Sequence, residues 1–460
     1  MTSFAKRRAK MSDNPYIPHS KEEIQEMLTE LGVNSLDELY KDVPSRLDSK
    51  LDIPEASDEF SLRRKLKHLS EMNASLEDYA VFRGAGAYKH LIPAAVNSIA
   101  SRGEFLTAYT PYQAEVSQGT LQMLFEFQTM ITELTGMDIA NSSMYDGASA
   151  TAEAALMAAR ITKKEDVLVA SSLHPEYIEV LKTYCFGADL NVIPVKYSAV
   201  SGNLDIEDLK EKISDNTATL ILGYPNFFGI VEHLDKIKEL LPKKTLLTTV
   251  VNPVALGLLE APGKLGADIV VGEGQPLGNP MNLGGPGLGL FATREKYIRK
   301  TPGRLIGQTK DLDGKTGYAM ILQTREQHIR REKATSNICS NHSFNALLAS
   351  IYMSLMGKNG IKEIAIRCLK KSHYLYEKLL KIEGISPVFD GPFFHEFVLR
   401  INKDKSVEEI NEKLLEEKIL GPLPLKRFFP NMEDCALFCT TEAVTNDDIT
   451  FLAGKLEEIL

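Results

Sequence analysis

A stretch rich in glycine and proline, residues 272–289, joins two short apolar runs and is the clearest candidate site in the sequence. Glycine lets a backbone or a ligand approach closely and allows positive φ, so two strands joined in this way could form a floor for a planar molecule. In enzymes that hold an aldehyde cofactor as a Schiff base, such a turn carries the reactive lysine. Here the turn carries Gln275 and contains no lysine. It therefore predicts a pocket without its own nucleophilic amine.

A strand expected before this turn, at residues 246–252, also lacks a group that a pyridinium cofactor needs. Such a cofactor needs an acidic side chain facing its ring nitrogen, and the acid would lie at the end of that strand. Residues 246–252 read LLTTVVN and contain neither Asp nor Glu. The acid is therefore absent as well as the lysine, and both absences point to a pocket without its own cofactor chemistry.

The best candidate for an anion site is the start of a helix predicted from about residue 147. Small residues there leave backbone N–H groups free, and Ser149 or Thr151 could help to hold a phosphate. Asp146, however, is well placed to cap the same N–H groups. Its carboxylate would repel a phosphate, so the sequence favours a helix that caps itself over a working phosphate site.

Three other segments each have two interpretations. His174 follows a predicted strand and could stack on a planar ring or be an ordinary loop histidine. Residues 224–229 (YPNFFG) form a tight turn whose phenylalanines could line a pocket, although core or a subunit contact is favoured. Gly84 and Gly86 are a fragment of a dinucleotide-binding pattern, but no strong strand precedes them, which favours a plain turn.

The densest basic cluster in the expected ordered part comprises His328, Arg330, Arg331 and Lys333. A solvated helix face is the usual meaning of such a run, and an interface or an anion contact is an equal alternative. Lys333 lies well beyond the glycine-rich turn and is a poor substitute for the missing Schiff-base lysine. We therefore assign no catalytic, cofactor-binding or metal-binding residue to this chain.

The composition describes a globular chain of 460 residues with room for two or three domains. Its net charge of −9 disfavours nucleic acid as a partner. No apolar run approaches the roughly 20 residues that a transmembrane helix needs, so no membrane segment is expected. The start, residues 1–11, is basic without the apolar core of a secretory signal, which favours a disordered leader, with Met11 as an alternative start.

The five cysteines are scattered and odd in number, which argues against a disulfide framework and for a reducing cytoplasm. Cys435 and Cys439 lie close in sequence, but two further metal ligands are not evident near them. We expect these two to be small apolar residues within a strand or a helix.

Apolar periodicity predicts the elements that position these segments. Between residues 166 and 271, short β-rich runs alternate with helical patterns, which predicts a mainly parallel sheet covered by helices on both faces. Ligands of such sheets bind at the carboxyl ends of the strands. Further helices are expected over 344–356 and 361–382, mixed with strands near the C-terminus.

The expected fold class is thus α/β, with three parts. Residues 1–75 form an N-terminal helical arm, 76–335 a large α/β domain, and 336–460 an α+β C-terminal domain. Within the arm, two capping-box patterns predict helix starts, Ser20 with Glu23 and Ser35 with Glu38.

Four stretches together resemble the glycine decarboxylase P-protein of the glycine cleavage system. They are residues 110–119 (TPYQAEVSQG), 128–136 (QTMITELTG), 284–287 (GGPG) and 323–339 (QTREQHIRREKATSNIC). The two longest are highly specific, and the resemblance runs from about Tyr16 into the C-terminal domain. It is to subunit 1 (alpha) of the two-subunit form, or to the N-terminal half of the single-chain form.

The resemblance implies a fold-type-I pyridoxal-phosphate architecture and a subunit of glycine dehydrogenase (aminomethyl-transferring, decarboxylating). In that family glycine loses carbon dioxide, and its aminomethyl group passes to the lipoyl arm of the H-protein. The implied cofactor, pyridoxal 5'-phosphate, belongs to the partner and is not bound covalently here. The partner's glycine turn is preceded by His-Lys-Thr, where this chain has Gly274-Gln275-Pro276.

The implied partners are subunit 2 (beta) in an α2β2 assembly, the lipoylated H-protein, glycine as substrate, and the T- and L-proteins, all in the cytoplasm. We expect this chain to complete the partner's pocket with residues near 109–113 and 328–333, because these polar segments lack any regular periodicity. Two alternatives are a scaffold that contributes no residue to catalysis and a self-sufficient pyridoxal-phosphate enzyme that uses an unrecognised lysine.

Overall fold

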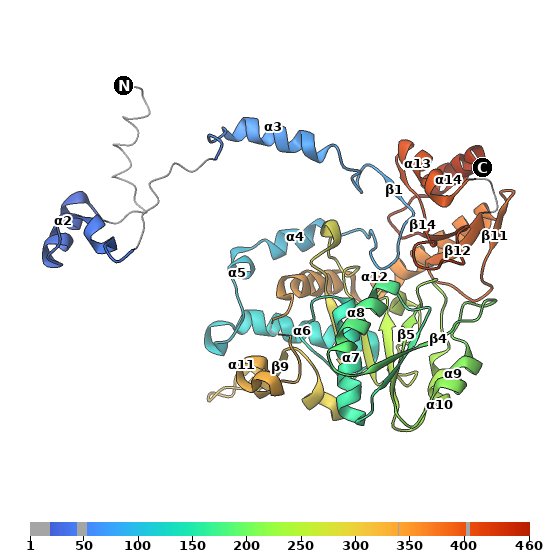
Figure 1. Cartoon of the computed structure of the whole chain (residues 1–460), viewed down its shortest axis with the longest axis horizontal. Helices are drawn as coiled ribbons and strands as arrows, with labels where there is room; N and C mark the ends of the chain where they lie inside the picture. Colours follow the sequence, from blue (N-terminus) through green and yellow to red (C-terminus); the bar gives the residue numbers. More distant parts are fainter. Residues whose placement is uncertain (1–18, 44–52, 339, 402–404) are drawn as a thin grey trace. The chain divides into compact units, whose positions relative to one another are not determined.

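The computed structural model describes residues 19–43, 53–338, 340–401 and 405–460 (Figure 1). By its internal contacts the chain divides into two compact units, Met1–Asn73 and Ala74–Leu460. The basic leader and Met11 lie outside the described residues. None of the helices in the described ranges combines the length and the apolarity that crossing a bilayer requires.

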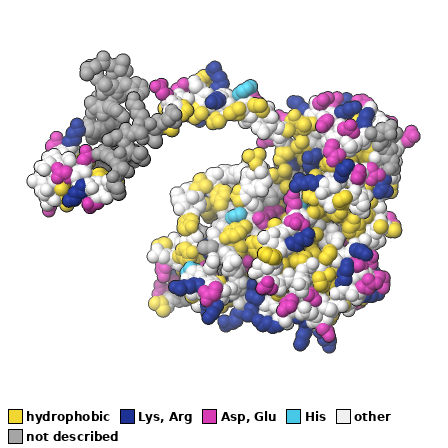
Figure 2. Space-filling model, in the orientation of Figure 1, with side chains coloured by type: hydrophobic (Ala, Val, Ile, Leu, Met, Phe, Trp, Pro, Cys, Tyr) yellow, Lys and Arg dark blue, Asp and Glu magenta, His cyan; other side chains and the backbone are white. Residues whose placement is uncertain are grey.

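The first unit contains α2 (Lys21–Glu30), η2 (Leu36–Tyr40) and α3 (Glu59–Ser70). The capping box of Ser20 and Glu23 is present, as predicted. The second predicted capping box is wrong, because Ser35 makes no capping bond and the Glu38 carboxylate instead accepts the N–H of Asn34. Hydrophobic side chains are visible at the surface along α3, which has no buried residue (Figure 2).

The second unit is built on a seven-stranded sheet in the order β2-β8-β7-β6-β5-β3-β4. The strands β3 to β7 pair in parallel, whereas β8 and β2 run antiparallel, which confirms the mainly parallel sheet. The strands are β2 (Ile139–Ala140), β3 (Asp166–Ala170), β4 (Asn191–Val195), β5 (Thr217–Tyr224), β6 (Leu246–Val251), β7 (Ile269–Glu273) and β8 (Gly289–Thr293).

Helices cover both faces of this sheet (Figure 1). Successive side chains of a strand point to opposite faces. In β5, Leu220 packs in one core cluster with residues of α6 (Gln118–Thr135) and α12 (Ser343–Leu379), and Ile221 packs in another with residues of α7 (Gly147–Thr162) and α8 (Pro175–Phe186). The helices of this layer are α4 (Ala94–Ala100), α5 (Gly103–Leu106), α6 (Gln118–Thr135), α7 (Gly147–Thr162), α8 (Pro175–Phe186), α9 (Ile206–Lys212) and α10 (Leu234–Leu240). Burial on both faces explains the near-continuous apolar runs of the central strands.

The helix α12 (Ser343–Leu379) runs from the large sheet to the C-terminal part. Two helices were predicted here, and the structure has one element interrupted at Gly357, whose φ is 58°. A second sheet, in the order β11-β12-β15-β14, is antiparallel. Its elements are β11 (Ile385–Pro387), β12 (Glu396–Ile401), β14 (Leu423–Pro424) and β15 (Cys435–Cys439), with α13 (Val407–Glu416) and α14 (Asn446–Ile459) beside it. The boundary at 335 and 336 stays a prediction.

The sequence reasoning missed the antiparallel hairpin of β9 (Leu305–Lys310) and β10 (Thr316–Ile321). Polar residues and glycines interrupt the apolar alternation of these strands, which hides the β pattern. A further short parallel pair is β1 (Ala80–Val81) with β13 (Ile419–Leu420). The remaining short helices are η3 (Ala114–Val116), η4 (Ala255–Gly257), η5 (Asn282–Gly284), η6 (Glu295–Lys300), η7 (Gln323–Arg325), α11 (Gln327–Arg330) and η8 (Arg331–Lys333).

Candidate functional site

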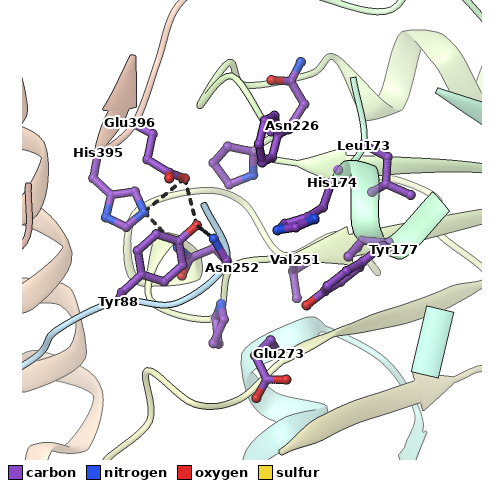
Figure 3. Close-up of a pocket in the computed structure, with 16 residues that line it drawn as sticks. Tyr88, Leu173, His174, Tyr177, Asn226, Val251, Asn252, Glu273, His395 and Glu396 are labelled. Carbon is purple, nitrogen blue, oxygen red and sulfur yellow. Dashed lines mark hydrogen bonds and ion pairs between the residues drawn. The ribbon is translucent and has the colours of Figure 1, made fainter. Parts of the chain in front are cut away.

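A cavity of about 70 Å³ lies at the carboxyl ends of β5, β6 and β7, where a parallel sheet is expected to bind its ligand (Figure 3). Its walls come from these strand ends, the start of α8, the segment before α4 and the start of β12. They are Gly86, Tyr88, Leu173, His174, Tyr177, Gly223, Pro225, Asn226, Phe227, Val250, Val251, Asn252, Pro253, Glu273, His395 and Glu396. The volume is well below the roughly 300–1,000 Å³ of ordinary ligand pockets.

Glu273, the last residue of β7, lies where the cavity meets the start of α7. We call this side the anion end, because the N–H groups of a helix start favour a negative charge. Its carboxylate accepts the backbone N–H of Gly147 at 2.9 Å, of Gln275 at 2.9 Å and of Leu288 at 2.7 Å. Burial raises the pKa of Glu273, and the three N–H donors oppose that rise. Because the positive start of α7 already holds a carboxylate, an external anion would have to displace it. No local pattern in the sequence points to Glu273 as a site residue.

Asp146 caps α7, as the sequence favoured. Its side chain accepts the N–H of Ser149 at 2.7 Å, and the Ser149 hydroxyl accepts the N–H of Asp146. The Thr151 hydroxyl donates to the carbonyl of Gly147 within the helix, so it is not available to a phosphate. A Cβ added to Gly147 would collide with the hydroxyl of Tyr177, which shows how closely this helix start is packed.

Gln275 stands where the turn would carry a lysine, and its amide is fully used. The Gln275 carbonyl accepts the N–H of Tyr88 at 3.0 Å, while its NH2 donates to the carbonyls of Tyr88 at 3.1 Å and of Asn279 at 2.8 Å. The side chain is buried. Gln275 thus ties the segment around Tyr88 to the glycine-rich turn and supplies no reactive group.

His174 lies in the cavity wall with one ring face on Tyr177 of the same chain, at 4.8 Å between centroids. Its Nδ1 accepts the N–H of Glu176, so Nε2–H donates to the carbonyl of Ala85 at 2.9 Å. Burial lowers the pKa of His174. Both nitrogens are engaged within the chain, which fits a structural histidine more closely than a ring awaiting a ligand.

At the end of β6, Asn252 holds the place of the missing ring-nitrogen acid. Its amide lies 3.0 Å from Nε2 of His395, and burial lowers the pKa of His395 to about 3, so that the imidazole is neutral and accepts (Figure 3). Beside it, Glu396 accepts the Tyr88 hydroxyl at 2.7 Å and the N–H of Ala85 at 2.6 Å. Burial raises the pKa of Glu396 to about 7. No local pattern pointed to His395 or Glu396, which come from a distant part of the sequence.

These residues do not fit a phosphorylated pyridinium aldehyde. Carboxylates of Glu273 and Asp146 stand at the anion end, and Asn252 replaces the acid at the ring-nitrogen end. None of the residues that line the described cavity is a lysine.

The remaining predicted segments have ordinary roles in this unit. Phe227 and Phe228 pack against residues of the C-terminal sheet, as the favoured interpretation expected, although Phe227 also lines the cavity. At Gly84 a side chain would collide with Glu396 and Cys439, and the following turn uses its N–H groups within the chain. This agrees with a plain turn.

The cysteines that the structure describes are free and buried. Cys435 and Cys439 lie in β15, as expected of small apolar residues. Elsewhere, Cys368, His90 and Glu442 gather potential metal-binding atoms within 4.8 Å. Glu442 already accepts His90 Nδ1 at 2.7 Å, the Cys368 thiol at 3.4 Å and the N–H of Leu91 at 2.8 Å. These hydrogen bonds explain why the three side chains lie close together.

The two segments expected to reach a partner do not line the cavity. Arg304 donates to the hydroxyl of Tyr112 at 3.2 Å and to that of Thr110 at 3.3 Å, and Tyr109 and Tyr112 are exposed. Arg325 donates to the carbonyls of residues 301 and 303 and holds the base of the segment that carries the basic cluster. Both segments are therefore exposed and anchored to the large sheet's unit.

The fold and the altered cavity define a member of the fold-type-I class of pyridoxal-phosphate-dependent enzymes. The sphingosine-1-phosphate lyase of Burkholderia pseudomallei is one solved structure of similar fold, with a TM-score of 0.65, 13% identity, and coverage of 91% of this chain and 93% of that one. At that identity the likeness concerns the fold alone.

Within this class, the chain belongs to the glycine cleavage system P-protein family, whose family model matches residues 14–456. A relative from Thermotoga maritima, named as subunit 1 of glycine dehydrogenase (decarboxylating), is 55% identical over 443 residues, 96% of this chain and 99% of that protein. One from Carboxydothermus hydrogenoformans with the same name is 49% identical over 96% and 99%. A crystal structure of an inhibitor-bound glycine decarboxylase (P-protein) matches at 39% identity with a TM-score of 0.88, covering 97% of this chain and 100% of that chain.

Proposed function

We propose that this chain is the subunit of a glycine-decarboxylating P-protein that carries no cofactor lysine, and that it works with a second subunit which holds pyridoxal 5'-phosphate. The cofactor supplies the electron sink for loss of carbon dioxide from glycine. The aminomethyl group then passes to the lipoyl arm of the H-protein. The observation that carries the proposal is twofold: Glu273 takes up an N–H group of the helix start beside the cavity, and Gln275 bonds the glycine-rich turn to Tyr88, in a chain whose relatives are named subunit 1.

The role of this chain is to complete the partner's site with exposed residues near 109–113 and 328–333. Arg304 restrains the tyrosines of the first segment, and Arg325 restrains the base of the second. Restraint matters because a group that is already ordered loses less entropy when it meets a ligand or a partner. Positive charges of the second segment would act on an anion at the partner's site.

The wider assembly follows from the same proposal. It comprises an α2β2 complex that meets the lipoylated H-protein and shares the cytoplasm with the T- and L-proteins. Free, buried cysteines support a reducing compartment. The large α/β domain, 76–335, carries both proposed contact segments, and the C-terminal domain, 336–460, closes the carboxyl ends of the strands.

Charge reversal of the basic cluster tests this role. In the variant Arg330→Glu/Lys333→Glu, we expect the assembled complex to lose about tenfold or more of its glycine–bicarbonate exchange, because an attractive charge becomes repulsive. The matched control is Lys243→Glu/Lys244→Glu, which reverses two exposed lysines before the amino end of β6. The control should retain the wild-type rate.

Unchanged assembly together with unchanged exchange in the Arg330/Lys333 variant would contradict the proposed role. Loss of assembly with normal kinetics in the assembled fraction would favour a scaffold. Sedimentation velocity measured beside the exchange assay separates these outcomes.

A further inference from the structure

The glycine-rich turn contains a leucine that no part of the described chain covers. Leu283, in η5, is fully exposed, with a relative exposure of 109%. Its φ is 55° and that of Asn282 is 43°, in the left-handed region that L side chains rarely adopt. Asn tolerates this region, but for Leu the conformation is unfavourable. The backbone is therefore held in a strained form that presents a large apolar side chain to the outside.

Polar side chains at the start of α12 hold this turn in place. The Asn345 amide donates to the carbonyls of Pro286 at 2.9 Å and of Gly287 at 2.8 Å. His342 Nδ1 lies 2.7 Å from the carbonyl of Gly287. A strained conformation persists only where its surroundings determine it, and such strain is concentrated at binding and active sites. The turn carries no reactive amine here, so binding is the role left to it.

Other exposed aromatic residues belong to the same framework. Asn341 accepts from Arg304 at 3.3 Å, and Arg304 holds the hydroxyl of Tyr112. Phe344, between the residues that fasten the turn, is 42% exposed. The short segment 341–345 thus bonds both to Arg304, which holds Tyr112, and to the carbonyls of Pro286 and Gly287, a few residues after Leu283. Aromatic side chains such as Tyr112 are typical anchors of protein interfaces, and an exposed Leu adds apolar area that a partner can bury.

We propose that the tip of the turn is a binding element, and that Leu283 inserts into an apolar recess of the second P-protein subunit. The inference rests on the proposed function, because the names of the relatives as subunit 1 imply a second subunit. Burial of Leu283 would offset the strain of its backbone only in the complex. In a catalytic chain this turn would carry the lysine. In this chain, the same turn would bind the second subunit, which carries the lysine.

The test compares binding of the full-length second subunit to immobilised full-length variants of this chain by surface plasmon resonance. Leu283→Asp should weaken binding by at least about tenfold, since a charge cannot enter an apolar recess without losing its hydration. Leu312→Asp is the matched control, because Leu312 is equally exposed, at 107%, on the loop between β9 and β10. Its affinity should stay within about twofold of wild type.

A second variant separates binding from folding. Leu283→Gly suits the positive φ and should leave the melting temperature of the isolated chain unchanged or higher, yet it should weaken binding as Leu283→Asp does. Equal affinity of wild type, Leu283→Asp and Leu283→Gly would overturn the inference and leave the proposed function standing. Failure of the wild-type chain to bind the second subunit would overturn the proposed function itself, and the inference with it.

Discussion

Glu273 and Gln275 each join separate segments of the chain through side-chain hydrogen bonds. Glu273 supplies from within the chain the negative charge that the start of α7 favours. Gln275 replaces an amine with an amide whose donors and acceptor are used by Tyr88 and Asn279. Both side chains are compatible with the sheet, because they satisfy backbone groups that would otherwise be buried without a partner.

The first prediction concerns Glu273. Glu273→Ala leaves the N–H groups of residues 147, 275 and 288 without their acceptor, which should lower the free energy of unfolding by roughly 2–4 kcal/mol. Inorganic phosphate should raise the melting temperature of the double variant Asp146→Asn/Glu273→Ala more than that of wild type, because neither carboxylate then opposes an anion at the helix start. Differential scanning calorimetry with and without phosphate measures both effects.

Glu260→Ala is the control for that experiment. Glu260 is exposed and pairs with Lys264 on the surface, so its loss should change stability by no more than about 0.5 kcal/mol. A Glu273→Ala variant as stable as wild type, or an equal response of the double variant and wild type to phosphate, would refute the assignment of Glu273 to the anion end.

At the scale of elements, the sequence predicted what local patterns encode. The strands of the parallel sheet, the capping box of Ser20 with Glu23 and the Asp146 cap follow from periodicity and capping chemistry. The hairpin of β9 and β10 did not, because its alternation is interrupted. Of the site, the sequence revealed the missing lysine and the missing acid, since residue type alone decides them. The bond between Gln275 and Tyr88 joins residues far apart in the chain, so no local pattern could reveal it.

Glu396 links two such distant elements, β12 and the segment 85–88, and gives the second prediction. Its pKa of about 7 lies above the ordinary value of 4.5, so the folded state holds the proton more tightly than the unfolded state. The stability due to protonated Glu396 is complete below about pH 4.5 and is lost as the pH rises to about 7. A shift of this size amounts to roughly 3 kcal/mol.

Glu396→Gln should remove this dependence. The free energy of unfolding of the variant minus that of wild type, from urea titrations, should increase by roughly 3 kcal/mol between pH 4.5 and 7.5. The comparison is made with wild type because His395, with a pKa near 3, changes stability in the opposite direction in both proteins. A difference that stays flat with pH would show that Glu396 does not titrate in this way.

At the scale of the whole molecule, the fold of the family extends over nearly all of this chain. The family model matches residues 14–456, and the Thermotoga maritima relative covers 96% of the chain. Phe228 and Phe389 lie 4.8 Å apart between ring centroids and join the carboxyl end of β5 to the C-terminal part. This chain has the fold but no lysine in the described cavity lining. We therefore expect it to contribute its surface, and not its cavity, to the complex.

Reduction of the complex by borohydride tests this account most directly. Borohydride converts a Schiff base into a stable amine, so the subunit that bears the cofactor lysine becomes covalently labelled. The assembled complex is supplied with pyridoxal 5'-phosphate, reduced, and analysed subunit by subunit by intact-mass spectrometry. We predict a label on the second subunit and an unchanged mass for this chain, both in the complex and alone. A covalent label on this chain, with glycine decarboxylation by the chain alone, would contradict the account.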